Sequence, residues 1–426
     1  MKKILLILIL FVIFYKSNSQ TFEKFIRTEY DEIVYDAIFF DSENVIFVLN
    51  QGQTDTYYDI KLYKMNYSTG NIVDSLDVNF VFSNDYYLGS LYQILKYNDT
   101  CYIGLGSARH KTSYDYQLYI FHMNEDFKIT FSTLSGSETE SDLLNDYIIN
   151  SDGNIVAVGK ASISKNAQFQ NPFSSNIVTN PSNNRNRIEK IKGDDILFYE
   201  CDIWGNQIER KIFNRDGIWA TTIFEIPNLS KYHFYHYFNS DGNFDILDKE
   251  SLEIDSSVNY PVYFLPRMAF PSANDSTYFV AGKEGGQSKT SFALKEYGLY
   301  YLSFLEVSYN GNVINQNTYN TDSTTLFPFK TFVSTEENIF IAGNTPLVIA
   351  NYFAPEKRWI LFFKLDIHGE VIWQKFFKGE VNYMPLKILS TPDGGTLIFS
   401  TRYDWNDEYP NQRDVHILKI DSDGNY

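Results

Sequence analysis

The sequence predicts an all-β protein made of one antiparallel unit repeated along the chain, and three observations carry this prediction. Short runs of β-branched and aromatic residues, each of strand length, are separated by Asp-Gly and Gly-Asn turns. These turns recur with a regular period, 58 residues from Gly311 to Gly369 and 55 from there to Gly424. Aromatic residues make up 17% of the chain, a composition that strands accommodate well.

The clearest copy of the unit spans residues 359–379. An aromatic and aliphatic run at 359–365 reaches a turn at Asp366-Ile367-His368-Gly369, and a second run follows at 371–377. Gly adopts the positive φ that such a turn requires without penalty, so we expect one β-hairpin here.

Each unit also has an earlier half, a turn followed by a short apolar strand that often ends in Gly, as in residues 151–159 and 337–343. A period near 50 residues with about four strands per unit is typical of β-propeller blades. Six units are clear and a divergent one lies between Lys231 and Asp255. The count favours seven blades of four-stranded antiparallel sheets over six or eight.

The two ends of the chain predict a closed ring. The last hairpin turn, at residues 423–425, is followed only by Tyr426, so the last unit lacks its outermost strand. Residues 22–27 (FEKFIR) match residues 373–378 (WQKFFK) in residue type. We therefore expect residues 22–28 to supply the missing strand, which removes an exposed sheet edge.

One segment interrupts the repeat within the single domain expected at residues 20–426. Residues 161–192 are rich in Ser, Asn and Gln and end in a basic patch, and we expect a long loop there. Shorter inserts occupy equivalent places at 51–58, 109–116, 285–297, 344–358 and 401–413. Because equivalent loops of successive blades lie on one face of the ring, these inserts are expected to build one variable surface.

Residues 1–19 are typical of an export signal, since Lys2 and Lys3 precede the apolar run 4–14 and small residues precede Gln20. The run is shorter than the roughly 20 residues of a membrane span, and no later stretch qualifies. We expect cleavage after Ser19, no membrane span, and a location outside the cell or on its outer surface.

The net charge limits the partners that the protein can bind, and the cysteine content limits the disulfide bonds that can stabilise it. Cleavage removes three lysines and no acid, so the formal net charge changes from −17 to −20, and so acidic a surface repels nucleic acid. Only Cys101 and Cys201 are present, so no disulfide framework holds the fold. The sequence allows either one disulfide bond between them or two unpaired thiols.

The phrases at residues 391–398 (TPDGGTLI) and 363–376 (FKLDIHGEVIWQKF) are similar to the repeats of secreted β-propeller proteins of the Bacteroidota. The resemblance covers nearly the whole chain after residue 19, most clearly its last two units, and implies the fold rather than a reaction. Many members continue into a C-terminal sorting domain for type IX secretion. This sequence stops at Tyr426, so the chain either lacks that domain or has been shortened before it.

Motifs that would indicate a reaction are absent. Asp421 and Asp423 alternate before Gly424 as in a calcium loop, but the further ligands of an EF-hand are missing, so a hairpin turn is favoured. His233 and His236 would point to opposite faces of one strand. The sequence has no nucleophile elbow, zinc-binding helix or phosphate loop, and it implies no metal and no cofactor.

The most suggestive local cluster is a loop in which aromatic rings alternate with carboxylates: Tyr403, Asp404, Trp405, Asp407 and Tyr409. Stacking of rings on sugars, with carboxylates that accept hydrogen bonds from hydroxyl groups, would use this composition. The alternative is that these rings pack between blades. Trp204 and Trp219 are weaker candidates.

These observations favour a secreted or cell-surface, monomeric, non-catalytic binding protein whose loop-bearing face recognises a protein or a polysaccharide. One alternative is a polysaccharide-degrading enzyme that uses a pair of carboxylates. The abundant acids are, however, also explained by an acidic surface that is simply solvated. A structural spacer on the cell surface is another.

Overall fold

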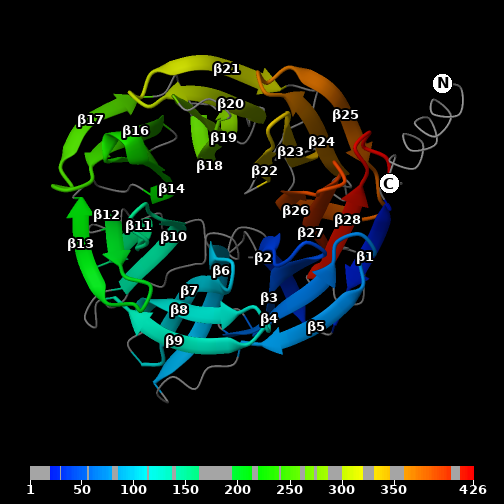
Figure 1. Ribbon diagram of the computed structural model, residues 1–426, viewed down its shortest axis with the longest axis horizontal. Helices are drawn as coiled ribbons and strands as arrows, with labels where there is room; N and C mark the ends of the chain where they lie inside the picture. The colour runs from blue at the N-terminus through cyan, green and yellow to red at the C-terminus, as the bar shows by residue number, and fades with distance from the viewer. Residues whose placement is uncertain are drawn as a thin grey trace, which may run out of the picture.

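The computed structural model describes residues 20–426 except 29, 55–56, 79–84, 113–114, 137–140, 163–193, 214–218, 239–240, 260–263, 273–275, 286–299, 320–330, 346–358 and 404–412. The described residues form seven four-stranded antiparallel sheets arranged as blades around a central axis (Figure 1). The predicted seven-bladed β-propeller is therefore confirmed, and the alternatives of six and eight blades are wrong.

The strands of each blade follow one another outward from the axis, except that the outermost strand of blade 7 is the first of the chain (Figure 1). Blades 1 to 4 comprise, in order, β2 (Asp31–Phe39), β3 (Asn44–Thr54), β4 (Tyr57–Asn66) and β5 (Ile72–Asp77); β6 (Tyr86–Asn98), β7 (Cys101–His110), β8 (Tyr116–Asn124) and β9 (Ile129–Ser135); β10 (Ser141–Ile149), β11 (Ile155–Ser162), β12 (Asp194–Cys201) and β13 (Gln207–Phe213); β14 (Trp219–Ile226), β15 (Lys231–Phe238), β16 (Asp241–Asp248) and β17 (Ile254–Asn259). Blades 5 to 7 comprise β18 (Phe264–Pro271), β19 (Thr277–Gly285), β20 (Tyr300–Ser308) and β21 (Val313–Tyr319); β22 (Phe332–Ser334), β23 (Asn338–Thr345), β24 (Trp359–Asp366) and β25 (Val371–Phe377); β26 (Asn382–Ser390), β27 (Thr396–Tyr403), β28 (Arg413–Ile420) and β1 (Phe22–Ile26). A single 3₁₀ turn, η1 (Pro227–Leu229), interrupts the strands of the described chain.

The N-terminal strand closes the ring as predicted. β1 pairs antiparallel with β28, in a register that runs from Phe22 opposite Lys419 to Ile26 opposite Val415. The Phe22 ring also reaches blade 1, where a Cβ added to Gly70 would lie 2.8 Å from it. The strand therefore contacts both the last blade and the first.

The predicted hairpin at residues 359–379 is formed by β24 and β25. Asp366 begins its turn, and one carboxylate oxygen accepts hydrogen bonds from the backbone N–H groups of His368 (2.8 Å) and Glu370 (2.9 Å). Gly369 follows with a φ of 84°. This side-chain capping of a tight turn explains why Asp or Asn so often starts these turns.

Each such turn also contacts the preceding blade. Tyr319, at the end of β21, donates a hydrogen bond to the Gly369 carbonyl (2.7 Å), and Asn317 donates one to the His368 carbonyl (3.2 Å). Ser135 of blade 2 makes the same kind of bond to the Gly205 carbonyl of blade 3 (2.5 Å). The turns thus join neighbouring blades as well as strands.

Two of these turns have no glycine at the positive-φ position. Phe127 (φ 59°) and Leu252 (φ 52°) take its place, and both side chains are buried against the preceding blade. Phe127 lies edge-on to Phe40 of blade 1, with ring centroids 5.8 Å apart. Apolar burial there offsets the cost of a left-handed backbone.

The glycine that recurs near the end of the second strand has a separate cause. A Cβ on Gly159 would lie 2.1 Å from the Leu143 carbonyl oxygen, and one on Gly106 would lie 2.2 Å from that of Ser90. In both blades the innermost strand has its register shift at this point. The bulge pushes the inner backbone outward, and only glycine leaves room for it.

The core consists of clusters that fill the seams between adjacent blades. One joins Val156, Val158 and Phe198 of blade 3 to Tyr232 and Phe234 of blade 4. The cluster between blades 2 and 3 contains both cysteines as free thiols, and burial raises the pKa of Cys201 to about 12. The open question of a bridge is thus answered by two unpaired thiols.

The two faces of the ring differ in their connections. On the loop face, the second and third strands of the blades are joined by residues 55–56, 111–115, 163–193, 239–240, 286–299, 346–358 and 404–412. The insert expected at 161–192 falls here, with Ala161 and Ser162 still in β11 and residues 163–193 outside the described residues. The opposite turn face carries the short turns. No helix of the described chain has the length and apolarity needed to cross a membrane.

Candidate functional site

The candidate site lies on the loop face where blade 7 meets blade 1. There β27 ends at Tyr403 and β28 begins at Arg413, and these two residues pair across the strands. They are the strand ends that flank the loop 404–412: the end of β27 is called its first stalk and the start of β28 its second stalk. Tyr403 is thus placed at the base of the loop, whereas the other predicted site residues, Asp404, Trp405, Asp407 and Tyr409, lie outside the described residues.

An ion pair between the first and last blades fixes the second stalk. One oxygen of Asp31, at the start of β2, accepts hydrogen bonds from the Arg413 backbone N–H (3.0 Å) and from Nε (2.6 Å). The other oxygen accepts one from Nη2. The Arg413 side chain is 8% exposed and that of Asp31 28%, so this two-pronged contact is partly shielded from water.

A second ion pair fixes the first stalk. Asp414 lies opposite Arg402 in the strand register, and the Arg402 guanidinium donates to its carboxylate at 2.9 Å. Arg27, which follows β1, approaches the same oxygen at 3.7 Å. The Asp414 side chain is 5% exposed, whereas that of Arg27 is half exposed. The site thus has a buried carboxylate and an arginine at its rim.

Glu32 follows Asp31 on β2, pairs with Gln51 in the strand register and is fully buried. Burial raises its pKa to about 7, assisted by the nearby charges of Asp414 and Asp31, although hydrogen bonds from Thr28 and Gln51 oppose the shift. Its Oε2 has no hydrogen-bond partner among the described residues. A carboxyl that changes charge near neutral pH is typical of functional sites.

The charges of the seam depend on this one group. With Glu32 protonated, three guanidinium groups (Arg27, Arg402 and Arg413) face two carboxylates (Asp31 and Asp414). Glu23 of β1, whose carboxylate faces His416 at 3.1 Å, adds a further acid to the same seam. Arg27 and Arg402 can donate hydrogen bonds to hydroxyl or carboxylate groups of a ligand at the rim.

The innermost strands beside the site carry an apolar cluster. Ile33, Tyr35, Met384 and Leu386 of blades 1 and 7 form one buried cluster, and Tyr92 of blade 2 packs against it. The Tyr35 and Tyr92 rings meet edge to face at 5.6 Å. This cluster packs blades 1, 2 and 7 together at their inner edges.

Acids on the innermost strands connect neighbouring blades. Asp36 accepts a hydrogen bond from the Ile94 N–H of blade 2 (2.9 Å) and pairs with Lys387 of blade 7 (2.6 Å). Asp146 accepts the equivalent bond from Ile223 of blade 4 (3.1 Å). These residues and Glu32 were not predicted from the sequence, although an acid within an apolar strand is a signal of a buried polar contact.

The other candidates of the sequence have structural partners. His233 contacts the Tyr278 hydroxyl (2.6 Å), and burial lowers the His233 pKa to about 3, whereas His236 faces Asp245 at 3.1 Å. The two histidines therefore diverge as expected, and no cluster of metal-ligating residues exists within the described residues.

The alternating acids of the last blade lie in a hairpin turn. Asp421 accepts hydrogen bonds from the N–H groups of Asp423 (2.9 Å) and Asn425 (2.8 Å), as a hairpin turn requires.

Trp204 is 53% exposed on the turn face, where its ring meets His122 at 4.8 Å and Phe131 at 5.1 Å. Trp219 begins β14.

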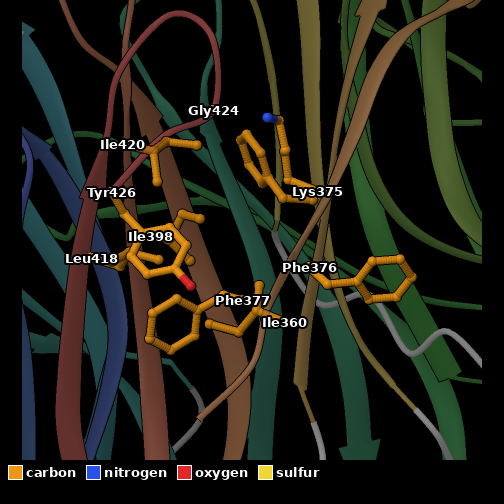
Figure 2. Close-up of a pocket in the computed structure, with 10 residues that line it drawn as sticks. Ile360, Lys375, Phe376, Phe377, Ile398, Leu418, Ile420, Gly424 and Tyr426 are labelled. Atoms are coloured by element: carbon orange, nitrogen blue, oxygen red, sulfur yellow. The ribbon is translucent and has the colours of Figure 1, made fainter.

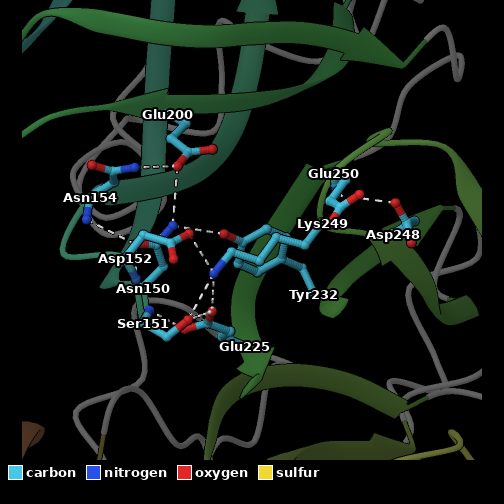
Figure 3. A network of polar contacts seen from close by, with 10 residues as sticks. All are labelled: Asn150, Ser151, Asp152, Asn154, Glu200, Glu225, Tyr232, Asp248, Lys249 and Glu250. Carbon is cyan, nitrogen blue, oxygen red and sulfur yellow. Dashed lines mark hydrogen bonds and ion pairs between the residues drawn. The ribbon is translucent and has the colours of Figure 1, made fainter. Parts of the chain in front are cut away.

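Two further features, a polar network and a small groove, lie away from the loop face. Figure 3 shows a polar network between blades 3 and 4, in which Lys249 contacts Glu225 (2.7 Å), Asp152 (2.8 Å) and Ser151 (2.8 Å). Each polar group there already has a protein partner, so the network fastens the two blades.

Figure 2 shows a small groove between blades 6 and 7, lined by apolar residues and closed on one side by Tyr426. It encloses about 260 Å³, open solvent at its mouth included. Its floor is formed by the buried side chains Ile360, Ile398 and Leu418. The groove is thus an incompletely filled part of the seam and offers only Lys375 as a charged group.

Comparison with known proteins extends no further than the fold. No protein-family model matches the chain, and no curated protein matches its sequence. Among solved structures, the hydrazine synthase of Kuenenia stuttgartiensis is similar with a TM-score of 0.53 at 7% identity, over 94% of this chain and 98% of that one. The periplasmic gluconolactonase PpgL of Pseudomonas aeruginosa gives 0.52 at 7% identity, over 89% and 97%. The Dos1 propeller gives 0.45 at 10% identity, over 92% and 79%. At 7% identity, the likeness to the first two establishes a shared architecture alone.

Proposed function

We propose that the protein is a non-catalytic binding module, exported to the cell exterior or outer surface, whose loop face recognises a polysaccharide or protein partner. The observation that carries the proposal is the contrast between the faces. The long connections leave from one face, and the ends of the loop 404–412 are held there by two partly buried ion pairs. A rigid scaffold that presents variable loops is the common arrangement of binding proteins.

The composition of that loop favours a carbohydrate ligand. Trp405 and two tyrosines alternate with carboxylates between stalks that carry Arg402 and Arg413. Aromatic rings supply apolar faces for sugar rings, while the charged groups supply directional hydrogen bonds to hydroxyls. Export is supported by the apolar run at residues 4–14, and the proposed kinship with secreted propellers of the Bacteroidota by the phrases at residues 363–376 and 391–398.

A second function, hydrolysis of a polysaccharide, is favoured by one observation. Glu32 and Asp414 are two buried carboxyl groups in different surroundings, of which Glu32 has a pKa raised to about 7 and Asp414 is paired with arginine. Two carboxyl groups in different surroundings are what acid–base catalysis on glycosides uses.

One experiment separates these functions. The protein without residues 1–19 is incubated with a panel of polysaccharides, and both retention of protein and release of soluble sugar are followed. Retention without release is the expected result. Release of sugar would show catalysis and direct attention to Glu32 and Asp414. Neither retention nor release would overturn carbohydrate binding and leave a protein partner or a spacer role.

A further inference from the structure

β25 is the outermost strand of blade 6, and no further strand of the described chain pairs with its outer side (Figure 1). Its register against β24 shifts between Val371 and Trp373, at the turn end, and is regular from there to Phe377. The outward N–H and C=O groups of this regular stretch can therefore pair with a strand of another molecule.

This edge is also the most apolar of the outermost strands. Three large apolar side chains are exposed along it, those of Val371 (47%), Ile372 (52%) and Phe376 (37%). The outermost strands β1, β5, β13 and β21 expose one each, namely Phe25, Val73, Ile208 and Ile314. An exposed apolar edge is a template for pairing with another strand.

The residues that flank the strand carry opposite charges. Glu370 precedes β25 and Lys378 follows it, and both side chains are exposed. Neither has an ion-pair partner among the described residues, although the Lys378 ammonium lies 4.7 Å from the centre of the Trp359 ring. Each lies four positions from Gln374. The segment is therefore complementary in charge to a reversed copy of itself.

An antiparallel pair of two β25 strands, centred on Gln374, matches these groups. Glu370 of each copy then lies opposite Lys378 of the other, and Ile372 lies opposite Phe376. Opposite charges and apolar pairs across strands stabilise a sheet. The two Gln374 amides lie on the two-fold axis of such a pair.

Other registers and other edges are less suited to self-pairing. A shift of the centre by one residue would place Lys375 opposite Lys375, which destabilises the pair. β13 also carries charges of both signs, but Arg210 is already paired with Asp142 (2.7 Å) and Lys211 with Glu253 (2.8 Å). The pattern thus selects β25 and one register.

We propose that β25 is the docking edge for a second copy of this chain, paired antiparallel around Gln374 so that the two copies of blade 6 form one sheet. The protein is then a dimer rather than the monomer expected from its sequence. β25 runs from the turn face to the loop face, so the two loop faces of the dimer point in opposite directions. One dimer then joins two polysaccharide chains, a consequence that rests on the proposed binding function.

Sedimentation velocity of the protein without residues 1–19 tests the dimer without any ligand. A single strand pair is a small interface and both copies are acidic, so we expect a Kd of about 10 μM. Glu370→Lys and Lys378→Glu each bring like charges together and are expected to weaken association at least about tenfold. The double variant exchanges the two charges and is expected to restore wild-type association.

The matched control is Glu337→Lys, which changes another exposed acid of blade 6 and alters the net charge as Glu370→Lys does. It is expected to associate as the wild type does, within about twofold. The two single variants change the net charge in opposite directions, so a loss shared by both cannot come from net charge. A wild type that is monomeric up to about 100 μM, or single variants that associate like the wild type, would overturn the proposal.

Disulfide trapping locates the interface. Under mild oxidation, Gln374→Cys is expected to form a covalent dimer, because the two thiols meet on the two-fold axis. Gln316→Cys, at the equivalent exposed position of β21, is expected to stay monomeric. Equal trapping of both variants would contradict pairing through β25. A monomer that retains polysaccharide would sink the dimer alone, whereas a dimer that retains none would sink carbohydrate binding alone.

Discussion

His416 lies at the centre of the seam that closes the ring, fully buried on β28. Its Nε2 faces a Glu23 oxygen on β1 at 3.1 Å, and its ring lies within 5.2 Å of the Phe25, Phe377 and Tyr383 rings. Burial lowers the His416 pKa, while Glu23 opposes this shift and Arg402 adds to it. The neutral ring is therefore the form that the folded seam accommodates.

The lowered pKa of His416 predicts that the folded protein loses stability in acid. Because the folded pKa lies below the ordinary 6.5, the unfolded chain takes up the proton first as the pH falls. The contribution of His416 is thus present above about pH 6.5 and is lost below it. We expect the melting temperature of His416→Gln to depend less on pH between 7 and 5 than that of the wild type.

The matched control is His368→Gln, which changes an exposed histidine in a hairpin turn. It should retain the wild-type pH dependence of the melting temperature. An unchanged profile in His416→Gln would contradict the assignment.

At this scale the sequence predicted little of the site. Tyr403 was singled out and lies at the base of the loop, but Glu32, Asp31 and Arg413 were not. Asp31 and Arg413 are 382 positions apart, and only ring closure brings them together. A pKa raised by burial and by charges from another blade has no local sequence signature.

Gly159 shows how an element of the blade depends on close backbone approach. Its φ is not in the left-handed region, yet an added Cβ would lie 2.1 Å from a backbone oxygen and 2.6 Å from the Leu144 Cα. Backbone atoms cannot rotate away as a side chain can. The glycine is therefore required by the bulge of β10 rather than by a turn.

Gly159→Ala should lower the free energy of unfolding by about 3 kcal/mol, because the inner strand must shift to make room. The control Gly394→Ala has a φ of 78°, but the added Cβ would lie 3.6 Å from its nearest neighbour, the Ser422 Cβ, so only backbone strain of about 1 kcal/mol is expected. Denaturant titration of both variants gives the comparison. Equal losses would show that crowding at the bulge has no cost.

Elements were the most predictable level of this molecule. The hairpin at 359–379 follows from turn residues and strand-length apolar runs, both of which are local. Phe127 and Leu252 show where this reasoning fails, since they take the position of glycine in a turn. Their left-handed backbone is stabilised by burial in the neighbouring blade, a contact that the turn sequence does not contain.

Ring closure depends on β1, the strand that joins blade 7 to blade 1. Deletion of residues 20–28 from the protein that starts at Gln20 removes the partner of β28, exposes His416 and leaves Asp414 without Arg27. We expect the melting temperature to fall by about 5 °C or more. A melting temperature equal to that of the undeleted protein would show that closure by β1 contributes nothing.

The architecture of the whole molecule was predictable because the unit repeats and because its ends complement each other. Residues 22–27 match an outermost strand in residue type, and the last blade lacks one. Function was not predictable at this scale, since the same ring serves proteins as different as a hydrazine synthase and a gluconolactonase. The loops, rather than the blades, carry what distinguishes one propeller from another.

The central claim is that the loop face, and not the turn face, recognises the partner. It is tested most directly by the affinity of Trp405→Ala and Trp204→Ala for a polysaccharide that the wild type retains. Trp405 belongs to the loop 404–412, whereas Trp204 is exposed in a turn of the opposite face. We predict at least about tenfold weaker binding for Trp405→Ala, the loss of one stacked ring, and wild-type affinity for Trp204→Ala. Wild-type affinity in Trp405→Ala, or an equal loss in both variants, would contradict the account.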